Sequence, residues 1–203
     1  MKSLIPILDN GHGGMINGVY QTAGKRSPKI EDRVLYEGAY NRWIVNGIIE
    51  SLDTAGIPYF HISPELRDIS LQTRVNRANK IFKQFPNTYL LSIHANIGFG
   101  KGTGYEGFTS TGQTPSDDVA EVFLTNFKAD FPNERPRFDT YSDGDKDKEA
   151  SYKILIRTTG RAFLMEMGFM DHLEDNKKLR DKWHRQCQIN SLVRSIIELY
   201  EGI

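Results

Sequence analysis

The most informative segment of this chain is TYLLSIHAN, which occupies residues 88–96. Its first part, residues 88–93, is almost entirely apolar, which predicts a strand covered on both faces, as in a parallel sheet flanked by helices. His94 and Asn96 follow this run directly. Because open α/β sheets bind ligands beyond the carboxyl ends of their strands, His94 is a candidate site residue.

Apolar runs of strand length alternate with segments of helical period along the rest of the chain. Gly56 stands where the first helix is expected to stop, and Ser70 can cap the second. This alternation predicts a single-domain α/β fold with a twisted, mainly parallel β-sheet flanked by helices on both faces. Strands are expected at residues 4–8, 58–62, 88–93, 105–109, 153–158 and 162–167, and helices at 31–53, 70–85, 116–131 and around Trp183, Leu192, Ile196 and Tyr200. The polar stretch 132–151 has the length of a lid or binding loop.

Composition excludes several classes of function. The 203 residues suit one domain, and 26 basic residues balance 26 acidic ones, so no one-signed surface is expected to attract nucleic acid or anionic lipid. The single cysteine, Cys187, leaves no internal disulfide or thiolate zinc cage, so a metal would be held by histidine and carboxylate. The amino-terminal apolar run is too short for an export signal or a membrane span, which predicts a soluble chain made in the cytoplasm and no membrane insertion.

Three residues that can do chemistry stand at the ends of predicted strands. His12 comes after the first strand, His94 after the central one, and Glu166 closes the last one. Parallel neighbours would bring all three to one edge of the sheet. A fourth candidate, Glu37, lies near the start of the first long helix, on the inward-facing stripe of positions 37, 41, 44, 48 and 52.

These residue types suggest a zinc site. An inward-facing carboxylate needs a cation or hydrogen-bond donors, and two imidazoles with one carboxylate suit a catalytic zinc that keeps one position open for water. We therefore interpret His12, Glu37 and His94 as ligands of one Zn²⁺ ion. Glu166 is expected to point to the same face of its strand as apolar residues. Desolvation there should raise its pKa into the range of a general base.

Each of these assignments has a structural alternative. His94, taken alone, would more simply be a core histidine bonded to a backbone carbonyl. Glu31 competes as the helical ligand, and Glu166 would also suit a buried ion pair with Arg157 or Arg161. The glycine-rich turn around His12 would equally suit a phosphate-binding turn.

Four blocks of sequence carry a more specific pattern in their order and spacing. They are ILDNGHGG (7–14); Glu37 with Asn41; Leu71, Arg74, Ala78–Asn79 and SIHAN (92–96), followed by GYEGF (104–108) and Ser110; and ILIR (154–157), LMEMGF (164–169) and Leu179. Together they resemble the type 3 family of zinc-dependent N-acetylmuramoyl-L-alanine amidases. The resemblance implies cleavage of the amide bond between the lactyl group of N-acetylmuramic acid and L-alanine in peptidoglycan. It also implies zinc at His12, Glu37 and His94 and a catalytic Glu166. Asn10 replaces the usual proline of this family, and MDH (170–172) replaces a more usual isoleucine-serine-asparagine.

Two rival functions remain open from the sequence. A zinc carboxypeptidase or endopeptidase acting on the stem peptide would use the same ligands, because a ligand set does not determine the bond that is cut. The third hypothesis is a non-catalytic wall-binding protein. The presence of Glu166 argues against it. With residues 1–203 as the catalytic domain and no separate wall-binding domain or signal peptide expected, the chain suits a phage endolysin. Such an enzyme is made in the host cytoplasm and reaches the wall through a holin, although a bacterial enzyme whose signal was removed would look the same.

Overall fold

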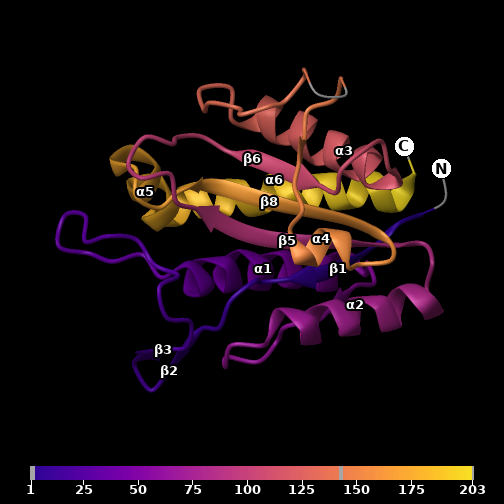
Figure 1. The fold of residues 1–203 in the computed structure, drawn as a ribbon, viewed down its shortest axis with the longest axis horizontal. Helices are drawn as coiled ribbons and strands as arrows, with labels where there is room; N and C mark the ends of the chain where they lie inside the picture. Colours follow the sequence, from indigo (N-terminus) through magenta and orange to yellow (C-terminus); the bar gives the residue numbers. More distant parts are fainter. Residues whose placement is uncertain (1–2, 142–143, 203) are drawn as a thin grey trace.

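Six strands form one sheet in the order β4-β1-β5-β8-β6-β7. Figure 1 shows its inner strands β1, β5, β8 and β6. The structure is a computed structural model that describes residues 3–141 and 144–202. Four strands run parallel, β6 is antiparallel to β8, and β7 is parallel to β6, so the expected mainly parallel sheet is confirmed. The strands are β1 (Ile5–Asp9), β4 (Phe60–His61), β5 (Thr88–Asn96), β6 (Glu106–Thr109), β7 (Lys148–Glu149) and β8 (Arg161–Phe169), and a separate hairpin pairs β2 (Met15–Ile16) with β3 (Val19–Tyr20).

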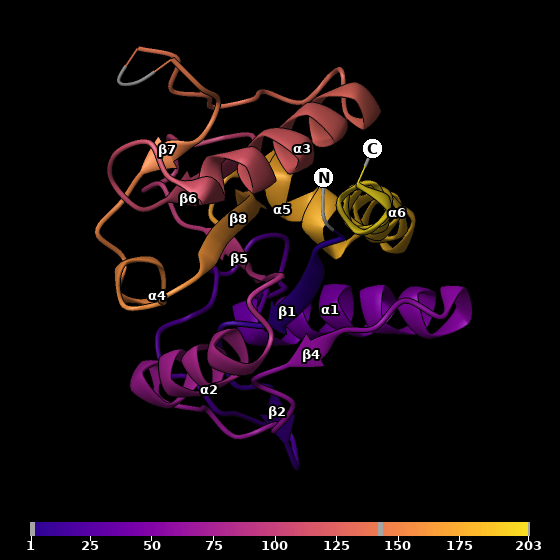
Figure 2. The ribbon, with the colours of Figure 1, turned by 90° about the vertical axis from the view of Figure 1, so that its right-hand side faces the viewer.

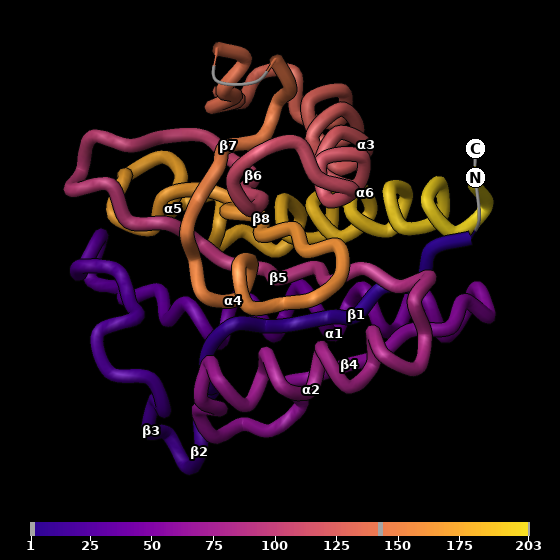
Figure 3. The backbone as a smooth tube through the Cα atoms, turned by 45° about the vertical axis from the view of Figure 1, so that its right-hand side comes forward, coloured from indigo at the N-terminus to yellow at the C-terminus, as the bar shows by residue number. Residues whose placement is uncertain are grey.

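Helices cover both faces of the sheet, as the alternation predicts (Figure 2). The larger core lies under α1 (Glu37–Ala55), α3 (Pro115–Asp130) and α6 (Lys182–Glu201). A smaller apolar cluster lies under α2 (Leu71–Gln84) and α4 (Lys153–Ile156), while α5 (Leu173–Arg180) follows β8 at the carboxyl end of the sheet. At the opposite end of the sheet, the segment before β1 lies beside the last turns of α6, where the Leu4 amide donates to the Leu199 carbonyl (Figure 3). No helix in the described part of the chain is long and apolar enough to cross a membrane.

The central strand β5 is buried on both faces. Tyr89, Leu91 and Ile93 point into the larger core, whereas Leu90 faces the smaller cluster. Since side chains alternate along a strand, Ser92 and His94 share the face of Leu90. The site therefore develops on the side of the sheet that α2 and α4 cover.

Both predicted helix boundaries are confirmed. Gly56 ends α1 in the left-handed region with φ 68°, which glycine adopts without steric cost. The Ser70 hydroxyl accepts a hydrogen bond from the Thr73 amide at 3.2 Å and so caps α2.

Two local predictions were wrong. Residues 153–156 form the short helix α4 and not a strand, because periodicity cannot separate strand from helix in so short an apolar run. The first long helix begins at Glu37, since residues 31 and 32 have positive φ. The other two expected helices are confirmed. α3 begins at Pro115, one residue before the expected start, and is capped by Thr114. α6 contains Trp183 near its start, where the side chain is 76% exposed.

The stretch 132–151 is not structureless. Its first part is held along β6, where the Tyr105 amide donates to the Arg135 carbonyl at 3.1 Å and the Arg137 amide donates to the Tyr105 carbonyl at 3.0 Å. Its last part contains β7. Residues 142 and 143, within the predicted loop, lie outside the described residues.

Candidate active site

The candidate residues meet at the carboxyl edge of the sheet. His94 on β5 and Glu166 on β8 are direct partners across neighbouring parallel strands, and His12 follows β1 on the other side of β5. Glu37 is the first residue of α1. This helix returns against the sheet after β1, which brings its amino end to the same edge, where the helix dipole favours a carboxylate.

Glu37 lies between the two histidines. Its Oε1 atom is 2.9 Å from Nδ1 of His94 and 3.3 Å from Nε2 of His12. The two imidazole rings are nearly perpendicular, with centroids 5.0 Å apart. One ligand atom from each of the three residues lies within 4.8 Å of the other two, so the structure brings the three predicted ligands together.

Two glycines permit this close approach. Gly11, with φ 70°, lies so near the His94 ring that a Cβ atom there would overlap its Cε1 and Nε2 atoms. A Cβ atom on Gly38 would overlap the Gly13 carbonyl oxygen. The loop after β1 and the start of α1 therefore pack backbone against backbone, which places His12 and Glu37 beside His94.

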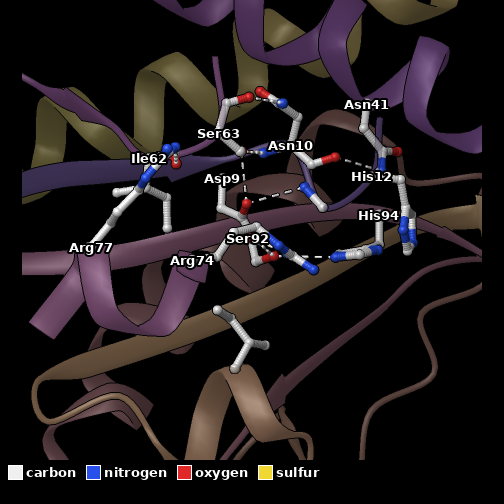
Figure 4. A network of polar contacts seen from close by, with 12 residues as sticks. Asp9, Asn10, His12, Asn41, Ile62, Ser63, Arg74, Arg77, Ser92 and His94 are labelled. Atoms are coloured by element: carbon white, nitrogen blue, oxygen red, sulfur yellow. Dashed lines mark hydrogen bonds and ion pairs between the residues drawn. The ribbon is translucent and has the colours of Figure 1, made fainter. Parts of the chain in front are cut away.

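Asn10 fastens the same loop where the family usually has proline. Its amide donates to Ser63 Oγ at 3.1 Å, a bond that proline lacks the N–H to make. Its side-chain Nδ2 donates to the Ser63 carbonyl at 2.6 Å (Figure 4). Its Oδ1 lies 2.6 Å from Nε2 of His61. The Arg42 guanidinium adds a hydrogen bond to the His12 carbonyl at 3.1 Å. These contacts hold the loop between β1 and His12 in place.

The three residues fit a zinc ion. Burial by itself would raise the pKa of Glu37, but the His12 and His94 imidazoles bring that pKa well below its ordinary value, so the carboxylate is ionised. Nε2 of His12 is buried without a hydrogen-bond partner among the described residues. Ligands of a tetrahedral zinc at 2.0–2.1 Å stand about 3.3 Å apart, close to the separations of Glu37 from the two histidines.

Glu166 provides a second, differently placed carboxylate. Its Oε2 atom is buried and has no hydrogen-bond partner in the described part of the chain. Burial raises its pKa well above the ordinary value, the charges of Glu37 and Glu106 raise it further, and Lys25 opposes them. No ion pair joins Glu166 to Arg157 or Arg161 among the described residues, which removes the structural alternative for this residue.

Glu106 is a site neighbour whose role was not predicted. It is the direct partner of Glu166 on β6, but its Oε2 contacts Nζ of Lys148 at 2.6 Å and Nε of Arg137 at 2.9 Å. Asn96 donates to its other oxygen. The two facing carboxylates therefore have different surroundings: Glu106 is paired with two cations, whereas Glu166 contacts none among the described residues. The signal available in the sequence was a glutamate at the same strand parity as the inward-facing Phe108.

Position also bears on the alternatives for His94 and Glu31. Both ring nitrogens of His94 face side-chain oxygens and not a backbone carbonyl. The Glu31 side chain is 54% exposed and pairs with Lys177 and Arg180, away from the histidines. His172 caps α5, while the neighbouring carboxylate of residue 171 binds the amides of residues 98 and 100 in the loop after β5.

A mainly parallel sheet whose carboxyl edge carries two imidazoles, an ionised carboxylate and a second, desolvated carboxylate has the composition of an α/β hydrolase centre. The family model of N-acetylmuramoyl-L-alanine amidases matches residues 7–198 of the sequence. The chain therefore belongs to the N-acetylmuramoyl-L-alanine amidase family. Membership of this family confirms the expected hydrolysis of the muramyl–L-alanine amide bond in peptidoglycan. Of the three hypotheses drawn from the sequence, the family supports the amidase.

Solved structures share the whole fold. An N-acetylmuramoyl-L-alanine amidase from Clostridium difficile 630 superposes with a TM-score of 0.77 at 20% identity, covering 100% of this chain and 99% of that one. AmiC2 of Nostoc punctiforme gives 0.71 at 22% identity, with 96% of each chain covered. The catalytic domain of the CD27L endolysin targeting Clostridia difficile gives 0.64 at 17% identity, with 98% of each chain covered. No curated protein matches the sequence.

Proposed function

We propose that this amidase is zinc-dependent, with His12, Glu37 and His94 as the ligands of one ion and Glu166 as the general base. The observation that carries the proposal is the convergence of three ligand atoms within 4.8 Å, one strand away from a buried carboxylate oxygen that has no partner among the described residues. An ionised carboxylate and two imidazoles are the donors that a catalytic zinc accepts while one position stays open.

Each residue has a defined task in the hydrolysis. When bound, zinc supplies Lewis-acid polarisation of the scissile carbonyl and a lower pKa for water. Glu166 accepts a proton from the attacking water as the new C–O bond forms, and returns that proton to the L-alanine nitrogen as the C–N bond breaks. Because its pKa is raised by burial, Glu166 holds and releases a proton closer to neutral pH than an exposed glutamate does.

The test is product identification on purified peptidoglycan. The proposal expects glycan strands with free lactyl groups, together with intact stem peptides that begin with L-alanine. A chelator should stop their release, and added zinc should restore it. Trimmed stem peptides would support the peptidase, and zinc binding without any soluble product would support the non-catalytic wall-binding protein.

We also propose that residues 1–203 act as the catalytic domain of a lytic enzyme of the phage endolysin type, made in the cytoplasm and acting on the wall. The similarity to the catalytic domain of an endolysin supports this setting. Co-expression with a holin should lyse the producing cells, as measured by turbidity, whereas the Glu166→Gln variant should not. Intact cells after co-expression of an active wild-type enzyme would contradict the setting while leaving the hydrolytic activity unaffected.

A further inference from the structure

The second ring nitrogen of His94 contacts a buried network of hydrogen-bonded polar side chains. Nδ1 faces Glu37, whereas Nε2 lies 3.2 Å from the Ser92 hydroxyl. The Ser92 hydroxyl in turn lies 2.8 Å from Oδ2 of Asp9 (Figure 4). Ser92 and Asp9 are direct partners across β5 and β1, so the sheet itself sets this contact.

The hydrogen-bond partners determine which atom donates and which accepts at Asp9, Ser92 and His94. Asp9 is surrounded by donors: Arg74 and Ser92 at Oδ2, and Ser63 and the Gly11 amide at Oδ1. Its carboxylate therefore only accepts, and the single Ser92 proton is donated to it. The Ser92 oxygen is left as an acceptor for His94, which requires the proton of a neutral His94 to sit on Nε2 and leaves the lone pair on Nδ1.

This arrangement is costly as a purely structural device. Asp9 is fully buried and Arg74 is only 6% exposed, with 2.6 Å between Nη1 of Arg74 and Oδ2 of Asp9. A buried ion pair is weak grounds for stability, because desolvation offsets much of the attraction. The hydroxyl of Ser92 likewise occupies a fully buried position within the apolar part of β5, between Leu91 and Ile93. A role in the site accounts for both.

We propose that Ser92 is a positioning residue, which holds His94 by Nε2–H so that Nδ1 presents its lone pair to the metal, with Asp9 and Arg74 fixing Ser92 in turn. The inference rests on the proposed zinc site and deepens it. Metal-binding histidines generally donate their other ring N–H to such a partner, and loss of that partner typically weakens metal binding by 10–100-fold.

Ser63 offers a matched control for Ser92. Both hydroxyls donate to Asp9 at 2.8 Å, one to each carboxylate oxygen. Both are buried, with 2% exposure for Ser63 and 0% for Ser92. Only Ser92 also contacts His94. Ser63 instead accepts a hydrogen bond from the Asn10 amide at 3.1 Å, so a merely structural role of the Asp9 network would make Ser63→Ala at least as damaging as Ser92→Ala.

The experiment measures zinc affinity of the full chain by competition with a chromogenic chelator. Ser92→Ala is expected to bind zinc about 10–100-fold more weakly than the wild type. Ser63→Ala loses its hydrogen bonds with Asp9 and the Asn10 amide but no contact to His94, and its loss of zinc affinity should be clearly smaller. Ser92→Thr, which keeps the hydroxyl, should recover most of the affinity. Equal losses in both alanine variants, or none in Ser92→Ala, would overturn the inference.

A second measurement needs no variant. In the zinc-loaded wild type, ¹⁵N NMR of the His94 ring should show the metal on Nδ1 and the proton on Nε2. Metal on Nε2 would overturn the inference even if Ser92→Ala failed to fold. A wild type that binds no zinc would overturn the proposed zinc site as well, whereas a zinc-binding wild type with an unaffected Ser92→Ala variant would overturn this inference alone.

Discussion

Glu166→Gln is expected to lower kcat on purified peptidoglycan by about 10²–10⁴-fold, the usual contribution of a general acid–base group. Glutamine keeps the shape of the side chain but can neither accept the proton of the attacking water nor return it to the leaving amine. Since Glu166 is not among the proposed ligands, zinc affinity should stay within about threefold of the wild type. Near-normal turnover in this variant would show that another group moves the proton.

Stability measurements separate this effect from unfolding. The pKa of Glu166 is raised by burial in the folded protein, so the folded state keeps this proton at pH values where the unfolded state has lost it. The free energy of unfolding therefore falls as the pH rises above the ordinary glutamate pKa, about 4.3. Zinc-free Glu166→Gln lacks this penalty, and its melting temperature at neutral pH should equal or exceed that of the wild type.

Glu106→Gln is the matched control on the facing strand. Glu106 is also a buried carboxylate, but Lys148 and Arg137 neutralise it. Its replacement leaves those two cations without their partner, which should lower the melting temperature while most of the turnover remains. A drop in kcat as large as that of Glu166→Gln would contradict the assignment of the general base to Glu166 alone.

Local signals explain which parts of the fold were predictable. β5 was predicted because its apolar run is long enough to be read as a strand buried on both faces, and the end of α1 because Gly56 takes a positive φ. The β2–β3 hairpin was missed even though Asn17–Gly18, both with positive φ, is a strong hairpin signal. Residues 153–156 could not be assigned from four residues alone, because tertiary packing against α2 and β8 determines that turn of helix.

The candidate active site also has a part that was predictable from the sequence and a part that was not. That His94 and Glu166 share one edge followed from strand parity and parallel neighbours, and the structure agrees. The link from His94 through Ser92 to Asp9 was not predictable, because it depends on which residue of β1 pairs with which residue of β5. Register is a tertiary property that one strand's own sequence does not encode.

Glu37→Gln is expected to abolish activity at stoichiometric zinc by removing the only charged ligand of the proposed site. The Glu37 carboxylate contacts both histidines through one oxygen, so its loss should weaken zinc binding by more than the 10–100-fold typical of a residue that merely supports a ligand. Titration calorimetry with zinc on the full chain measures this directly. The activity should return only partly at high zinc concentration.

Glu31→Gln completes this test, because Glu31 was the rival ligand on the same segment of sequence. Its exposed side chain pairs with Lys177 and Arg180, and solvent screens surface pairs of this kind so that they contribute little to stability. Zinc affinity and turnover of Glu31→Gln should therefore match the wild type. Tight zinc binding by Glu37→Gln, or weakened binding by Glu31→Gln, would mean that the amino end of α1 does not supply the third ligand. The ion would then have to be held by His12 and His94 with a different group.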